Sequence, residues 1–140
     1  MKITIINGPN LNLLGSRETD IYGDQNFDSF FKSLKSKYPE IDLDYHQSNI
    51  EGELINIIQD SRESDGIIIN AAAYTHTSIA ILDALKMFKG IVIEVHITNI
   101  HAREEFRHHS FISKVAKGII AGFGEESYLM AINYLSLIHI

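Results

Sequence analysis

The chain has 140 residues, 45% hydrophobic and 21% charged, which is typical of a single globular domain with a substantial core. It has no signal-peptide pattern and no apolar run near the ~20 residues that span a bilayer, so we expect a cytosolic protein that does not bind membranes. The absence of cysteine excludes disulfides, thiolate catalysis and the usual zinc sites, and the net charge of −6 argues against nucleic acid as a partner.

Short apolar strands alternate with amphipathic helical windows along the whole chain. We predict strands at 2–6, 42–46, 66–70, 90–95 and 118–121, and helices at 26–38, 51–60, 77–87, near 102–106, and at 126–138. The segment 48–51 (SNIE) fits a capping box. This alternation predicts one domain, 1–140, with an α/β flavodoxin-like three-layer sandwich and a five-stranded parallel sheet in the order 2-1-3-4-5.

Polar residues follow the predicted strands where they end. In an open α/β sheet, ligands bind beyond the carboxyl ends of the strands, so we expect these residues to converge on one edge. This position makes Asn70 and His76 candidate site residues. The segment 7–24 is long for a connection of this kind, and such loops are often lids. It carries Arg17 and Tyr22, which alone would be ordinary loop residues.

The segment 93–110 is the most informative part of the chain, because it holds four of the seven histidines and two of the four arginines. Glu94 and His96 lie two residues apart at a strand end and share one face, so the carboxylate can orient the imidazole. The alternative is a histidine that caps the strand end through backbone bonds. Arg103 and Arg107 have the i,i+4 spacing of a solvated face with modest ion pairs. For Arg107 a site role is equally open.

Several common sites are missing from the sequence. It has no glycine-rich motif for dinucleotides or nucleoside triphosphates, no His-Glu-x-x-His metal spacing and no nucleophile elbow. A signalling receiver domain would need acidic residues where Asn7 and Asn70 stand. We therefore expect neither a metal nor another cofactor.

Five segments share a distinctive pattern: NGPNLNLLG at 7–15, RE at 17–18 with YG at 22–23, QSNIEG at 47–52, THTSIA at 75–80, and EVHITNIHAREEFR at 94–107. Through these segments the chain resembles the type II 3-dehydroquinate dehydratase family over nearly its whole length.

The resemblance implies a cofactor-free dehydration of 3-dehydroquinate to 3-dehydroshikimate, a step of the shikimate pathway, through an enolate. Tyr22 matches the base, acting as tyrosinate, and Arg17 supplies the nearby positive charge that a tyrosine needs to ionise near neutrality. Asn10 matches the residue that stabilises the enolate. His96 matches the general acid that protonates the departing hydroxyl, and Glu94 orients it.

The resemblance also implies how the substrate is held. Asn70, Thr98 and the backbone N–H of Ile97 match the groups that bind its carboxylate, with Thr98 replacing a frequent serine. His76 and Arg107 match the groups that bind ring hydroxyls.

Assembly is implied by the resemblance alone. The family forms homododecamers arranged as a tetramer of trimers, and Asp83 matches a residue that reaches a neighbouring subunit's site. On its own, Asp83 reads as a surface or interface carboxylate. Two departures stand out: Ala72 replaces a glycine and is expected to strain a turn that needs positive φ, and Thr19 replaces a proline in the lid.

Two other classes of protein remain as alternatives. One is a flavodoxin-like module that binds flavin or nucleotide without catalysis, which the missing phosphate loop argues against. The other is a non-catalytic oligomeric scaffold, which would leave Tyr22 and His96 without a joint purpose.

Overall fold

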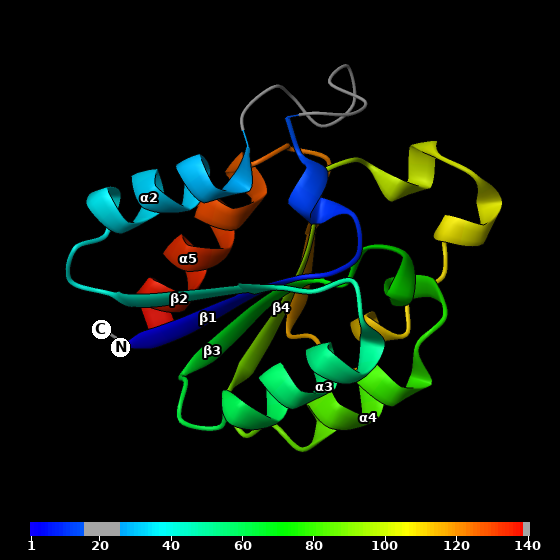
Figure 1. The fold of residues 1–140 in the computed structure, drawn as a ribbon, viewed down its shortest axis with the longest axis horizontal. Coiled ribbons are helices and arrows are strands. Elements are labelled where there is room, and N and C mark those ends of the chain that lie inside the picture. The colour runs from blue at the N-terminus through cyan, green and yellow to red at the C-terminus, as the bar shows by residue number, and fades with distance from the viewer. Residues whose placement is uncertain (16–25, 139–140) are drawn as a thin grey trace.

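The computed structural model describes residues 1–15 and 26–138. Its sheet is parallel, with the strand order β2-β1-β3-β4-β5, and helices cover both faces (Figure 1). The strands are β1 (Lys2–Asn7), β2 (Asp42–Gln47), β3 (Gly66–Asn70), β4 (Ile91–His96) and β5 (Gly118–Ala121). The predicted fold class and strand order are therefore confirmed.

Within the described residues the α-helices are α2 (Phe27–Lys37), α3 (Glu51–Asp60), α4 (Ile79–Lys86) and α5 (Glu126–Ile138). Short 3₁₀ turns follow β1, β3 and β4: η1 (Leu11–Leu13), η2 (Ala72–His76), η3 (Ile100–Ala102), η4 (Glu105–Arg107) and η5 (Ile112–Lys114). None of the described helices has the length and hydropathy of a transmembrane span.

Three local predictions were wrong. The helix expected near 102–106 is the pair of turns η3 and η4. The helix expected at 77–87 begins later, because the side chain of Ser78 accepts the backbone N–H of Ile81 and caps the helix there. The capping box is not formed, since the hydroxyl of Ser48 accepts the Ile50 N–H and donates to Glu53.

The two faces of the sheet build two hydrophobic cores. Successive strand residues point to opposite faces, so a buried parallel strand is apolar at every position. Ile68 packs in the core beneath α2 and α5, whereas Ile67 and Ile69 pack in the core above α3 and α4 (Figure 1). On β4, Ile93 and Val95 belong to the first core and Val92 to the second. The even-numbered positions Glu94 and His96 therefore share the face of Val92.

The carboxyl ends of β1 and β3 are tied together closely. The Gly8 N–H donates to the Asn70 carbonyl at 2.8 Å, and a Cβ at position 8 would lie 2.4 Å from the Ala71 carbonyl oxygen, so only glycine fits there. In the turn that follows β3, Ala72 has φ 53°. The strain expected from alanine at this position is therefore present.

Candidate active site

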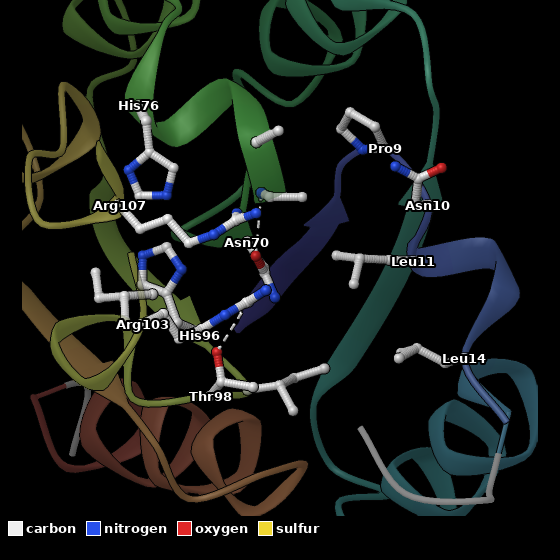
Figure 2. A pocket seen from close by; sticks show the side chains of 14 residues that line it. Pro9, Asn10, Leu11, Leu14, Asn70, His76, His96, Thr98, Arg103 and Arg107 are labelled. Carbon is white, nitrogen blue, oxygen red and sulfur yellow. Dashed lines mark hydrogen bonds between the residues drawn. The ribbon is translucent and has the colours of Figure 1, made fainter. Parts of the chain in front are cut away.

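A pocket opens at the carboxyl edge of the sheet, among the loops that follow β1, β3 and β4 (Figure 2). It is lined by Pro9, Asn10, Leu11, Leu14, Asn70, Ala72, Ala73, His76, His96, Ile97, Thr98, Ile100, Arg103 and Arg107. Apolar residues of the loop after β1 form one side, and histidine and arginine side chains form the other (Figure 2). The pocket can therefore bind a small anionic molecule between a cationic and an apolar wall.

Glu94 and His96 form a buried acid–imidazole pair at the end of β4. Their side chains are 1% and 5% exposed, and Nε2 of His96 lies 2.5 Å from Oε2 of Glu94. Ser110 donates to Oε2 at 2.9 Å and Ser113 donates to Oε1 at 2.5 Å. Burial, the largest single influence, raises the pKa of Glu94, but the hydrogen bonds and charge of its partners together lower it below the usual value. Glu94 is therefore ionised and orients the ring.

His76 lies beside His96, with the rings stacked and their centroids 6.4 Å apart. Its Nδ1 lies 2.8 Å from the carbonyl oxygen of His109, which can only accept, so Nδ1 carries the proton. Burial is the main reason that the pKa of His76 is lowered; the hydrogen bond to His109 opposes this effect, and electrostatic interactions with His96 and Arg107 add to it. A neutral His76 presents Nε2 as a hydrogen-bond acceptor.

Two arginines approach the pocket from the segment after β4 (Figure 2). Nη1 of Arg103 donates to Oγ1 of Thr98 at 3.4 Å, and Nε of Arg107 donates to Glu104 at 2.6 Å. The hydrogen bond from Arg107 is the main reason that the pKa of Glu104 is lowered. Guanidinium groups bind carboxylates and hydroxyl oxygens through several N–H donors, so this wall suits an oxygen-rich anion.

The floor of the pocket is held by a buried tyrosine from α5. The hydroxyl of Tyr128 donates to Oδ1 of Asn7 at 2.7 Å and accepts from Nδ2 of Asn70 at 3.3 Å. Oδ1 of Asn70 accepts the Ala72 N–H at 3.1 Å. Burial raises the pKa of Tyr128 strongly, so it stays neutral and keeps the orientation of both amides fixed.

Comparisons with known proteins agree with this geometry. The family model described as "Dehydroquinase class II" matches residues 1–136. A 3-dehydroquinate dehydratase of Bartonella bacilliformis is 52% identical over 137 residues, which cover 96% of this chain and 87% of that protein. The crystal structure of the type II dehydroquinase of Butyrivibrio crossotus has a TM-score of 0.93 and 47% identity, covering 97% of each chain. That of Propionibacterium acnes has the same TM-score at 40% identity, covering 97% of this chain and 96% of the other.

The chain belongs to the class II dehydroquinase family.

The structure brings most of the expected site residues together. Those that line the pocket are Asn10, Asn70, His76, His96, Ile97, Thr98 and Arg107. Glu94 lies directly behind His96. Asp83 is exposed on α4 and does not line this pocket. Arg17 and Tyr22, with the departure at Thr19, lie outside the described residues.

Several residues around the pocket were not expected from the sequence. Ser110 and Ser113 hold the carboxylate of Glu94, and Tyr128 holds Asn70. Hydroxyl residues are common in loops and helices, so no local pattern marks these three. Arg103, which read as a surface residue, lines the pocket. The i,i+4 spacing of Arg103 and Arg107 could have indicated that both lie at the site, because both follow the strand that carries His96.

Groups of three or more acidic or histidine side chains that could hold a metal ion are absent from residues 1–15 and 26–138.

Proposed function

We propose that this protein is an enzyme that dehydrates 3-dehydroquinate to 3-dehydroshikimate, with Tyr22 as the base and His96 as the general acid. The family membership supports the reaction, and the relative from Bartonella bacilliformis bears the name of that activity. The single observation that supports the mechanism best is the buried contact of Glu94 with His96 at the edge of the pocket.

The proposed reaction is a stepwise elimination. The tyrosinate of Tyr22 removes the proton alpha to the ketone, and the electron pair of that C–H bond forms an enolate. The enolate then collapses to the conjugated enone as the bond to the β-hydroxyl breaks. The departing oxygen takes a proton from His96 and leaves as water. A proton returned from Tyr22 to His96 restores the starting state.

The roles of Tyr22 as the base and Arg17 as its charge partner are assigned from the family resemblance. An unperturbed tyrosine has a pKa of ~10, so a guanidinium such as that of Arg17 beside Tyr22 would favour its ionised form. Asn10 lines the pocket with a left-handed backbone, φ 71°, and its N–H donates to Asn49 at 2.9 Å. We assign it to stabilising the enolate oxygen.

We assign the carboxylate of the substrate to Asn70, Thr98 and the backbone N–H of Ile97. The ring hydroxyls are assigned to His76 and Arg107. The neutral His76, with Nε2 as an acceptor, supports a bond from a hydroxyl proton.

We also propose that the active form is a homododecamer built as a tetramer of trimers, in which Asp83 reaches the site of a neighbouring subunit. Its exposed position on α4 leaves it available for such a contact.

The test is an ultraviolet assay for the conjugated enone with purified protein and 3-dehydroquinate. We expect turnover by the unsubstituted protein and its loss in His96→Ala, with Ser61→Ala as a control for a buried side chain remote from the pocket. Absence of product with folded, unsubstituted protein would contradict the proposed function.

A further inference from the structure

The segment 109–113, which leads from η4 into η5, makes several hydrogen bonds with the site. The carbonyl of His109 accepts from Nδ1 of His76, and the N–H of Phe111 donates to the carbonyl of Thr75 at 2.9 Å. Ser110 and Ser113 then both reach Glu94. This segment therefore holds both His76, which follows β3, and Glu94, which lies on β4.

The two serines donate hydrogen bonds to the lone pairs of the Glu94 carboxylate that do not accept from His96. Glu94 is 1% exposed, so solvent does not satisfy its carboxylate. Ser113 bonds one oxygen, and Ser110 shares the other with His96. Two O–H donors plus the imidazole favour the ionised carboxylate and leave it a single orientation.

We propose that Ser110 and Ser113 are positioning residues for proton delivery: they hold the Glu94 carboxylate so that it fixes the ring of His96. This inference rests on the proposed dehydratase function. Ser110 has a second role, because its hydroxyl also accepts the backbone N–H of Ser113 at 3.1 Å. Ser113 is therefore the cleaner position to test.

The central variant is Ser113→Ala. Because a hydrogen bond to a charged group is lost, we expect kcat to fall about tenfold. The acidic limb of the pH profile should stay where it is, because in the proposed mechanism it reports the ionisation of Tyr22 and not that of Glu94. The other charged or titratable groups around the pair are His76 on η2, Arg103 and Arg107 after β4, and the exposed Lys114 on η5, and all of them are retained.

Further measurements separate positioning from a structural role. Ser113→Thr keeps the hydroxyl and should restore kcat. Ser61→Ala, whose hydroxyl donates to the carbonyl of Ile57 in α3 at 2.7 Å, should leave kcat unchanged. In Ser113→Ala, KM should change by less than about twofold, and exchange of the substrate's alpha proton should persist. In a Glu94→Gln background, Ser113→Ala should have no further effect. If Ser113→Ala does not fold, Ser110→Ala takes its place.

The inference is overturned if Ser113→Ala keeps the unsubstituted kcat. It is also overturned if its loss persists in full on the Glu94→Gln background, or if proton exchange falls together with elimination. A failure of the proposed function looks different, since the unsubstituted protein would then neither exchange the alpha proton nor form the enone.

Discussion

At the scale of single residues, the most consequential side chain is Glu94, a carboxylate with almost no solvent access. A buried anion is costly unless every oxygen has donors, and here three groups supply them. Its burial alone raises its pKa, but its partners lower the pKa below the ordinary 4.5. The folded state therefore favours the anion more than the unfolded chain does.

This difference predicts a pH dependence of stability. The unfolded chain binds the Glu94 proton near pH 4.5 while the folded chain still does not, so stability is present above 4.5 and lost as the pH falls below it. Glu94→Gln should be less stable by about 1–3 kcal/mol at pH 7, and the deficit should shrink below pH 4.5. Urea unfolding between pH 7 and 3.5 measures this, with the exposed Glu105→Gln as a control. A deficit that does not change with pH would contradict it.

Ala72 is a second residue with a measurable consequence. Its φ of 53° lies in the left-handed region, where glycine has no steric penalty. Ala72→Gly should stabilise the protein by about 1 kcal/mol, because the relief of strain exceeds the entropy that glycine adds to the unfolded chain. Ala71→Gly is the matched control and should destabilise, because Ala71 is buried with φ −76°. Denaturant unfolding gives both values, and destabilisation by Ala72→Gly would show that the turn is unstrained.

At the scale of elements, α5 supports the site from behind the sheet. Tyr128 on this helix connects the ends of β1 and β3 through Asn7 and Asn70. Although α5 is distant in sequence from β3, it thereby sets the orientation of the Asn70 amide, which we propose binds the substrate carboxylate.

Removing that hydroxyl should affect binding as well as stability. Tyr128→Phe leaves buried amide groups without a partner, which should cost about 1–3 kcal/mol of stability and raise KM severalfold more than it lowers kcat. Tyr38→Phe is the matched control: its hydroxyl bonds Asn133 at 2.7 Å, also on α5, away from the pocket. It should lower stability and leave KM unchanged. Equal KM values for the two variants would count against a role of Tyr128 in binding.

The elements that could be predicted from sequence are those with strong periodicity. Each strand was placed to within a residue at its ends. For β1, β3 and β4 the signal is the continuous apolar run, bounded by polar turns, that is typical of buried parallel strands. The segment after β4 was mispredicted as a helix, since turns such as η3 and η4 depend on contacts with the rest of the fold. The pairing of Glu94 with His96 was predictable from their spacing along a strand. The bonds from Ser113 and Tyr128 were not, because they join positions far apart in the chain.

At the scale of the whole molecule, the proposed assembly can be tested directly. β5 is an edge strand, with Ile119 52% exposed, and Phe123 beyond it is 60% exposed. If the dodecamer forms, light scattering should give the mass of twelve chains of 15.8 kDa. Asp83→Ala should then raise KM, because Asp83 would act in a neighbour's site. Full activity in a species with the mass of one chain would contradict the proposal.

The central claim is that two residues divide the proton transfers, with Tyr22 removing the alpha proton and His96 supplying the proton for the hydroxyl. The most direct measurement is exchange of the alpha proton of 3-dehydroquinate with deuterated water, followed by NMR alongside product formation. We predict that His96→Ala still exchanges this proton without forming product, and that Tyr22→Phe does neither. Exchange that persists in Tyr22→Phe and vanishes in His96→Ala would show that the two roles are reversed and would contradict the account.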